Sequence, residues 1–225
     1  MSRAKNGDPQ PPRMPDKRPG QTGGRRDQNR RARLRQLCDA AVELFLEDGI
    51  ARVTIDRIVD RAGMAKGSFY RYFRDKTELC TTLLAPLEGR VMDAFSRCRQ
   101  ALAMARAPED LVAAYLAMSR EIAAVIVDNP QLSLLYLQES RAPKSGSRAP
   151  LVELSERIGD EAETLTEFAR EHGLLRDLDP RVQGLVVVGA VERLLQELLR
   201  GGLSAAPQDI AATVVTIILD GVRFR

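Results

Sequence analysis

The sequence contains few of the residues that build metal, redox and many catalytic sites. Its 225 residues include no tryptophan, one histidine and three cysteines, and the cysteines form no CxxC pair. So few soft ligands do not make a zinc site, and we expect neither a metal nor a cofactor. A glycine-rich phosphate loop and a nucleophile elbow are also missing. The sequence therefore argues against an enzyme.

The three cysteines offer little for redox chemistry. If one helix carries Cys80 and Cys98, their 18-residue separation places them roughly 27 Å apart, beyond the reach of a disulfide. Cys38 falls in the apolar spacing of a helix, where it is expected to fill a core. No basic residue is placed to lower the pKa of these thiols specifically, which disfavours a redox sensor.

Long apolar runs are absent as well. No stretch approaches the roughly 18 uninterrupted apolar residues that a membrane helix needs. The N-terminus is too polar for a secretory signal. We therefore expect a cytoplasmic protein without a membrane partner.

Charge is distributed unevenly along the chain. The net charge is only +3, but residues 1–80 hold 18 Lys and Arg against 11 Asp and Glu, and the remainder is acidic. A basic N-terminal third suits a polyanion, whereas the acidic remainder argues against a nucleic-acid groove along the whole chain. Residues 1–28 are rich in proline and glycine and almost lack apolar residues, so they are expected to form a disordered basic arm.

Apolar periodicity predicts helices throughout the rest of the chain. The first is expected at 31–48, ending at Gly49, and a short one begins after the potential N-cap Thr54 and ends at Gly63. A further short helix near Lys66–Phe73 follows a tight turn, so that residues 53–72 form a helix-turn-helix. Longer helices are expected at 76–104 (with a kink at Pro86), 108–127, 130–140, 149–172, 180–200 and 207–221.

Two β-branched runs are ambiguous. Residues 185–191 (LVVVGAV) and 213–219 (TVVTIIL) would suit buried strands by propensity alone. Each lies inside a longer segment with helix caps, so both are expected to be helical. The fold class is therefore all-α, with about nine helices. A helix that is apolar nearly all round must be covered on two sides, and the simplest second cover is another copy of the chain.

The second short helix has the composition of a DNA-reading element. Small residues at its start permit close approach to a major groove, and donors follow them. Phe69 and Phe73 should face inward, while the other side chains are distributed over the outer surface: Lys66, Gly67, Ser68, Tyr70, Arg71 and Tyr72. The alternative is that Tyr70 and Tyr72 merely cap a small core.

The run from Thr54 to Leu79, TIDRIVDRAGMAKGSFYRYFRDKTEL, resembles the signature of the TetR family of transcription regulators. With the segment from Phe45 to Gly49, the resemblance covers about 50 residues. It implies a three-helix DNA-binding domain at 29–78 and a helical ligand-binding and dimerisation domain at 79–225. The family often has Ser where this chain has Ala65 and His where it has Tyr72, which makes a borrowed operator sequence unsafe.

The resemblance also implies roles for individual residues. Thr54, Tyr70, Tyr72 and Lys76 should hold phosphates, which set register but carry little sequence information. Lys66, Gly67, Ser68 and Arg71 are the candidates for base edges, with Arg71 best placed to read a guanine. A homodimer through helices 180–200 and 207–221 would place two recognition helices on a pseudo-palindromic operator.

A ligand pocket is implied between Leu79 and His172, within the helical bundle. Its candidate lining residues are Met92, Phe95, Met104, Tyr115, Met118, Tyr136 and Phe168, although such residues at helical spacing also suit a plain core. The lack of tryptophan and the small number of polar residues at apolar positions favour a hydrophobic inducer. His172, beside Gly173, is expected to lie at a helix C-terminus.

Two function hypotheses remain. The first is a sequence-specific repressor, released from its operator by a small molecule and associated with the nucleoid when bound to DNA. The second is a non-specific DNA-binding or scaffold protein, for which the basic arm would suffice. Activators also occur in similar families, so the sign of regulation stays open.

Overall fold

The computed structural model describes residues 24–222, and within this range the fold is all-α, as predicted. It contains no strand there, so both β-branched runs are helical. The helices are α1 (Arg25–Asp48), α2 (Ile55–Arg61), α3 (Lys66–Phe69), α4 (Lys76–Met104), α5 (Pro108–Asp128), α6 (Pro130–Glu139), the 3-10 turn η1 (Gly146–Arg148), α7 (Ala149–Glu171), α8 (Pro180–Leu199) and α9 (Pro207–Val222).

Two expected boundaries are wrong. Helix α1 begins at Arg25, so the last residues of the expected disordered arm are helical, because the Gly24 carbonyl accepts hydrogen bonds from the amides of Asp27 and Gln28. Residues 1–23 of that arm lie outside the described residues. Helix α3 ends at Phe69 instead of Phe73, since the following amides turn back to Ser68 and Phe69 to reach the start of α4.

The chain divides into two compact units, residues 1–35 and 36–225, and the division falls inside α1. In the described part of the first unit, Arg31 forms an ion pair with Asp27 at 3.1 Å. Every feature discussed below belongs to the second unit. The boundary expected near residue 78 falls inside α4, so the helix-turn-helix region and the helical bundle share that helix.

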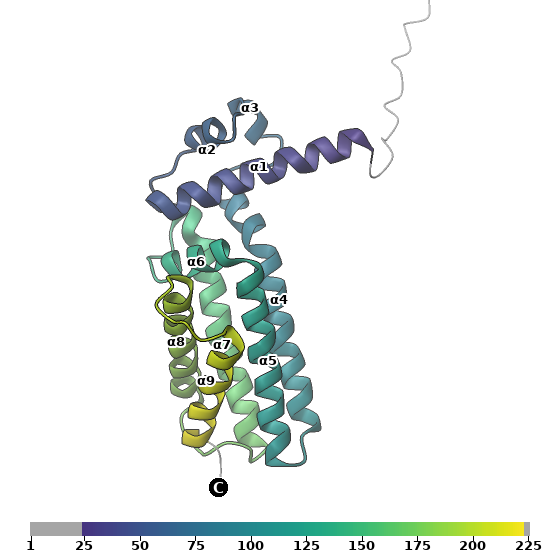
Figure 1. Ribbon diagram of the computed structural model, residues 1–225, viewed down its shortest axis with the longest axis vertical. Helices are drawn as coiled ribbons and strands as arrows, with labels where there is room; N and C mark the ends of the chain where they lie inside the picture. The colour runs from purple at the N-terminus through teal and green to yellow at the C-terminus, as the bar shows by residue number, and fades with distance from the viewer. Residues whose placement is uncertain (1–23, 223–225) are drawn as a thin grey trace, which may run out of the picture. The chain divides into compact units, whose positions relative to one another are not determined.

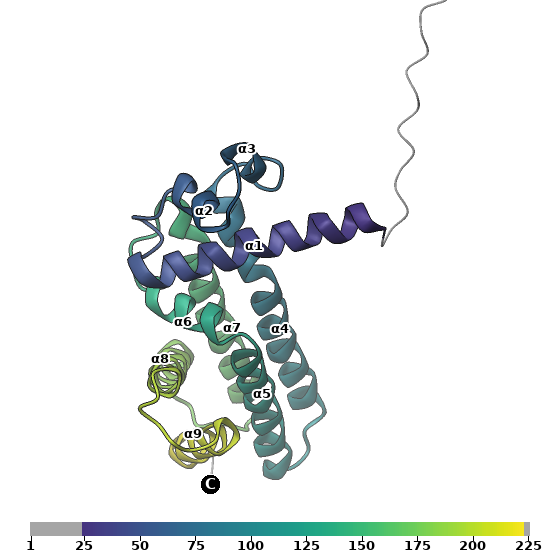
Figure 2. The ribbon, with the colours of Figure 1, turned by 45° about the horizontal axis from the view of Figure 1, so that its top comes forward.

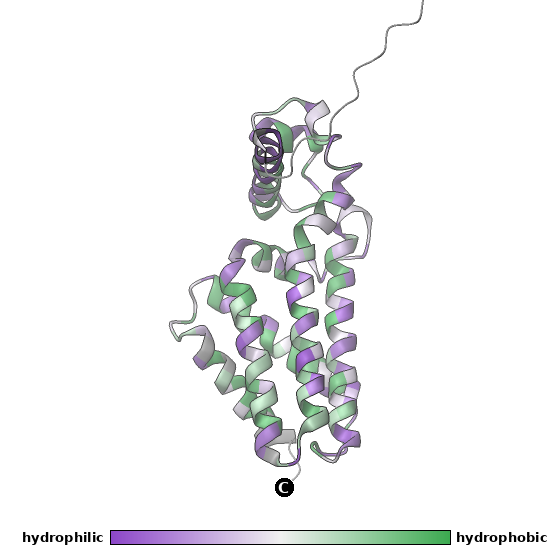
Figure 3. Ribbon diagram, turned by 90° about the vertical axis from the view of Figure 1, so that its right-hand side faces the viewer, coloured by the Kyte–Doolittle hydropathy of each residue, from purple (hydrophilic) through white to green (hydrophobic). Residues whose placement is uncertain are grey.

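The bundle forms an incomplete ring of five helices. Helix α4 packs against α5 and α7, α7 packs against α8, and α5 packs against α9 (Figure 1). Helices α8 and α9 make few contacts with each other, and Figure 2 shows them nearly end-on and apart. Figure 3 shows polar and apolar residues alternating around the bundle helices, as amphipathic helices require. The ring is therefore least closed between α8 and α9.

Close packing of α7 against α8 depends on one glycine. A Cβ atom at Gly184 would lie 3.0 Å from the backbone nitrogen of Glu163 and 3.2 Å from the carbonyl carbon of Ala162. Both contacts are to helical backbone, which cannot move as a flexible side chain can. Gly184 therefore sets how near α8 approaches α7, and through it the width of the ring.

Gly184→Ala should destabilise the fold by about 1–3 kcal/mol, because α8 must move away from α7 to admit the methyl group. Gly89→Ala is the matched control, since an added Cβ in α4 meets nothing within 4 Å. The control should stabilise the helix by up to about 1 kcal/mol. Urea unfolding followed by circular dichroism measures both changes. Equal stabilisation by the two substitutions would contradict the packing role of Gly184.

Candidate functional site

The helix-turn-helix is held by local caps and two buried rings. The Thr54 hydroxyl oxygen accepts a hydrogen bond from the Arg57 amide at 3.3 Å and so caps α2, as predicted. Gly63 ends α2 with φ +64°, in the left-handed region that favours glycine. Phe69 and Phe73 are 0% and 3% exposed, with ring centroids 5.5 Å apart. Both phenylalanines face inward, as the spacing predicts.

The outer face of α3 and the turn after it carries most of the expected DNA-contacting residues. Lys66, Gly67, Tyr70 and Arg71 are exposed, and Tyr72 is partly exposed. The Arg71 guanidinium has no hydrogen-bond or ion-pair partner within the described part of the chain. It is therefore available for a partner outside the protein.

Ser68 is not on this outer face. Its exposed fraction is only 7%, so the expectation that it lies on the outer surface is wrong. Successive residues of a helix are separated by about 100°, and Ser68 precedes the fully buried Phe69 in a helix of only four residues. The short helix places both residues against the core.

Lys66 has a protein partner. Its ammonium lies 2.8 Å from one carboxylate oxygen of Asp56 on α2 and donates to the other at 3.0 Å. This hydrogen bond raises the pKa of Lys66 above its ordinary value. An ion pair between exposed side chains is weak. Lys66 can therefore leave Asp56 for an external anion.

Lys76 is turned toward the protein. Its ammonium donates to the backbone carbonyl oxygens of Ile50 and Val53, each at 2.6 Å, in the loop between α1 and α2. Burial lowers the pKa of Lys76 below its ordinary value. Only one of its three N–H groups is left for a phosphate. Lys76 thus stabilises the loop that precedes the helix-turn-helix. The sequence does not suggest these two hydrogen bonds.

A buried carboxylate on α6 also holds this loop. Glu139 is 4% exposed, and its Oε1 accepts a hydrogen bond from the Ile50 amide at 3.1 Å. Its Oε2 accepts from Arg148 Nε at 2.5 Å. A Cβ at Gly49 would lie 3.0 Å from Glu139 Oε1, and Gly49 has φ +79°. Only glycine at position 49 suits both the backbone conformation and the approach of Glu139.

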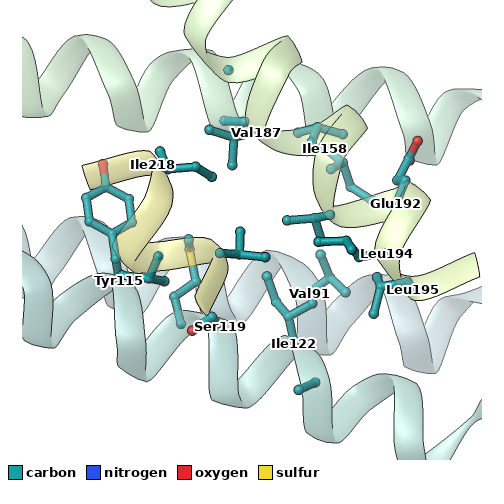
Figure 4. A pocket seen from close by; sticks show the side chains of 18 of the residues that line it. Val91, Tyr115, Ser119, Ile122, Ile158, Val187, Glu192, Leu194, Leu195 and Ile218 are labelled. Carbon is teal, nitrogen blue, oxygen red and sulfur yellow. The ribbon is translucent and has the colours of Figure 1, made fainter. Parts of the chain in front are cut away.

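A cavity of about 580 Å³ lies inside the helical ring, lined by residues of α4 to α9. Its walls are mostly Leu, Ile and Val side chains, many of which Figure 4 shows pointing into the cavity. Two lining residues, Val186 of α8 and Ile217 of α9, are also 62% and 68% exposed. The cavity therefore opens to solvent between α8 and α9.

Four of the expected pocket residues line this cavity, namely Phe95, Tyr115, Met118 and Tyr136. Met92 and Met104 do not line it, and Met104 is 74% exposed. Phe168 faces elsewhere and stacks on His172, with ring centroids 4.1 Å apart. His172 caps the C-terminus of α7, as expected, and Arg170 alone is basic in the last turn before it.

Sequence reasoning missed the cavity's polar groups. Glu192 of α8 accepts hydrogen bonds from the Tyr136 hydroxyl at 2.7 Å and from Arg141 at 3.0 Å. Burial, and next the charge of Glu192, raise the pKa of Tyr136, so it remains a donor. The side chains of Gln183 and Ser133 are buried and have no hydrogen-bond partner among the described residues. A polar residue at an apolar helix position was the available signal for Gln183.

The cysteine thiols are poorly suited to chemistry. Burial raises the pKa of Cys38 to about 11 and the pKa of Cys80 and Cys98 to about 12. All three remain protonated and weakly nucleophilic near neutral pH. Within residues 24–222, no cluster of side chains has the composition of a metal site. None of the helices in this range is long and apolar enough to span a bilayer.

Comparison with known proteins identifies the type of DNA-binding region. The model of the bacterial regulatory proteins of the tetR family matches residues 37–82, which contain the helix-turn-helix. The chain is 41% identical over 93 residues to the HTH-type transcriptional activator FasR of Mycolicibacterium smegmatis. Residues 37–82 therefore form a DNA-binding region of the TetR-family type. The match to FasR covers 40% of each protein, so it supports the DNA-binding region more than the bundle.

Solved structures of regulators share the TetR-family fold. The ketosteroid regulator KstR2 of Mycobacterium tuberculosis superposes with a TM-score of 0.64 at 20% identity, over 92% of this chain and 98% of its own. FadR of Bacillus subtilis, solved in complex with stearoyl-CoA, gives a TM-score of 0.61 at 17% identity, over 83% of this chain and 98% of its own. At such low identity these similarities establish the fold alone.

The matched region departs from the usual TetR-family signature at the start of α3. Ala65 occupies the N-cap position and provides no side-chain hydrogen bond to the helix. A Ser at that position would supply a cap or a hydroxyl contact. At the start of α3, only backbone groups and the Lys66 side chain are therefore available for polar contacts.

Lys76→Met should destabilise the protein by about 1–3 kcal/mol, because two loop carbonyl groups lose their donor. Lys144→Met is the control, since Lys144 is exposed and forms only surface ion pairs with Glu153 and Glu156. The control should change stability little. Urea unfolding compares the two variants. A loss of DNA affinity in Lys76→Met without any loss of stability would instead assign Lys76 to a phosphate.

Proposed function

We propose that the chain is a sequence-specific transcription regulator that acts as a homodimer, and that a small molecule in the helical cavity releases it from DNA. It would work in the cytoplasm, at the nucleoid when bound to DNA. The observation that carries this proposal is the exposed face of residues 66–72, called the recognition segment below. It lies inside the region that matches the TetR-family model. The apolar cavity inside the helical ring supports the second half of the proposal.

Different side chains in and near the recognition segment are proposed to contact bases and phosphates. Arg71, exposed and without a protein partner, is suited to bidentate hydrogen bonds with a guanine edge. Lys66 and Gly67 stand at the start of α3, where close approach to the major groove is needed. Thr54, which caps α2, and Tyr70 and Tyr72, which follow α3, are proposed to hold phosphates. Ser68, being buried, is no longer proposed as a base contact.

Helices α8 and α9 are proposed to form the dimer interface. Val182, Leu185 and Val186 are 58%, 51% and 62% exposed and lie on one side of α8, at i, i+3 and i+4. Ile217 of α9 is 68% exposed. Exposed apolar side chains gathered on two neighbouring helices favour a protein partner. A second copy of the chain would bury them and place two recognition segments on a pseudo-palindromic operator.

Helix α6 is proposed to transmit the state of the cavity to the DNA-binding region. Tyr136 lines the cavity and bonds to Glu192, and Glu139, three residues later, bonds to the Ile50 amide in the loop before α2. A ligand that displaces Tyr136 would shift α6 and thereby move this loop. The two recognition segments would then no longer match the spacing of the half-sites.

The ligand and the sign of regulation are proposed from the cavity and the relatives. The apolar walls favour a hydrophobic ligand, in keeping with a fold neighbour that was solved with stearoyl-CoA. FasR is named as an activator, whereas release from DNA by a ligand is the behaviour of a repressor. We favour the repressor, because occupation of the cavity is expected to disturb the loop that Glu139 holds.

A non-specific DNA-binding role is the second candidate, favoured by the basic N-terminal third of the chain. Selection of duplexes from a random pool, followed by titration of the selected and a scrambled duplex at several salt concentrations, separates the two. The regulator should prefer the selected duplex by at least 1,000-fold. Equal affinity for the two duplexes would exclude sequence-specific regulation.

Arg71→Ala should relax the preference at one base pair per half-site by about tenfold, because a bidentate contact to a base is lost. Arg120→Ala is the matched control, since Arg120 is exposed on α5, away from the recognition segment. Fluorescence anisotropy with duplexes altered at single positions measures both variants. Unchanged base preference in Arg71→Ala would show that Arg71 is not a base contact.

Leu185→Arg should convert the dimer of 24.9 kDa chains to monomer, since a charge would enter the apolar interface without a partner. Val127→Arg replaces another exposed apolar residue, on α5, and should remain dimeric. Sedimentation velocity gives the mass of each variant, and thermal unfolding checks that both are folded. A dimeric Leu185→Arg protein would place the interface elsewhere.

A further inference from the structure

The strongest unexplained feature of the bundle is a polar pair in an apolar cavity. Gln183 is 9% exposed, and neither its amide oxygen nor its amide nitrogen has a hydrogen-bond partner among the described residues. Ser133 is 4% exposed, and its hydroxyl is likewise without a partner there. Both residues line the cavity. Buried polar groups in proteins are normally hydrogen-bonded, so unpartnered ones at a cavity wall are available to a bound molecule.

Among the other polar groups of the wall, the Tyr115 hydroxyl also has no hydrogen-bond partner among the described residues, whereas the rest have partners. The Tyr136 hydroxyl bonds to Glu192, while the hydroxyls of Ser119 and Thr166 bond to backbone carbonyls of their own helices. Glu192 also pairs with Arg141. A ligand can therefore form new hydrogen bonds at Gln183 and Ser133 without breaking existing ones.

The charges of the wall are equally informative. The residues that line the cavity include no Lys, Arg or His, and Glu192 is the one charged residue among them. A carboxylate or phosphate inside this cavity would lose its hydration and meet no cation. The Glu192 carboxylate is itself neutralised by Arg141, so it offers little to a cationic ligand.

One face of α8 suggests an elongated ligand. Gln183, Val187 and Leu194 share this face, and Gln183 and Leu194 are eleven residues apart, or about 16 Å along the helix axis. Figure 4 shows the apolar side chains Val187 and Leu194 of this helix at the cavity wall, with Glu192 toward one end. A molecule that spans this length meets apolar groups along its middle and the Gln183 amide at one end.

We propose that the cavity takes an uncharged, elongated and mainly apolar small molecule whose polar end both donates and accepts a hydrogen bond at the Gln183 amide. An alcohol or a carboxamide has this chemistry, and an ionised carboxylate does not. The inference rests on the ligand-controlled regulation proposed above, and it narrows that proposal by excluding anions.

Four compounds with the same ten-carbon chain test the headgroup. Decanamide, decan-1-ol, sodium decanoate and decyltrimethylammonium are titrated at pH 8, below their micelle concentrations, against the full chain loaded with the uncharged dye N-phenyl-1-naphthylamine. Decanamide and decanol should displace the dye at concentrations at least tenfold lower than the two ions. Decanoate or the ammonium compound binding as tightly as decanamide, or none of the four displacing the dye, would overturn the proposal.

Gln183→Met tests the residue. It should weaken decanamide binding about tenfold and leave affinity for the dye unchanged, because Met keeps the size of the side chain but provides no donor. Gln100→Met, at an exposed position outside the cavity, is the matched control and should leave both affinities unchanged. Equal decanamide affinity in Gln183→Met and wild type would overturn the role of Gln183.

The same compounds separate this inference from the proposed function. Each is added to the complex of the chain with its selected duplex, and release is followed by anisotropy. Decanamide that binds the cavity at Gln183 but leaves the complex intact would refute ligand-controlled release and support the headgroup inference. Release by decanoate but not by decanamide would support ligand-controlled release and refute the headgroup inference.

Discussion

A single buried carboxylate connects the two functional regions of this chain. Glu139 bonds to the Ile50 amide, 89 residues earlier, and pairs with Arg148. Removing either partner from a buried, charged hydrogen bond is costly, so the loop between α1 and α2 is held firmly to α6. Gly49 makes room for this contact, and Lys76 holds the same loop through its carbonyls. The position of the helix-turn-helix therefore depends on where α6 lies.

The position of α6 depends in turn on the bundle. The ring of α9, α5, α4, α7 and α8 encloses an apolar cavity, and Tyr136 of α6 forms part of its wall. Helices α8 and α9 must serve two purposes, since their inner faces line the cavity while apolar side chains such as Leu185 face solvent. A partner subunit on α8 and α9 would also cover the mouth of the cavity. Dimerisation and ligand binding would then be linked through the same two helices.

The parts of the structure that depend on local sequence could be predicted, and the parts that depend on distant packing could not. The cap Thr54, the turn at Gly63 and the inward-facing Phe69 follow from spacing within a few residues. The burial of Ser68, the inward turn of Lys76 and the Glu139–Ile50 bond depend on how helices pack in three dimensions. Periodicity identified aromatic residues for the pocket, but Phe168 faces another way, and Gln183 becomes notable only when its surroundings are known.

The coupling through α6 is tested most directly by hydrogen exchange at the Ile50 amide. Tyr136→Phe removes the bond from α6 to Glu192 without adding bulk, and Tyr115→Phe makes the same change on α5, also at the cavity wall. If α6 links the cavity to the loop, the Ile50 amide should exchange several-fold faster in Tyr136→Phe than in wild type, and at the wild-type rate in Tyr115→Phe. An Ile50 exchange rate unchanged by Tyr136→Phe would contradict the coupling.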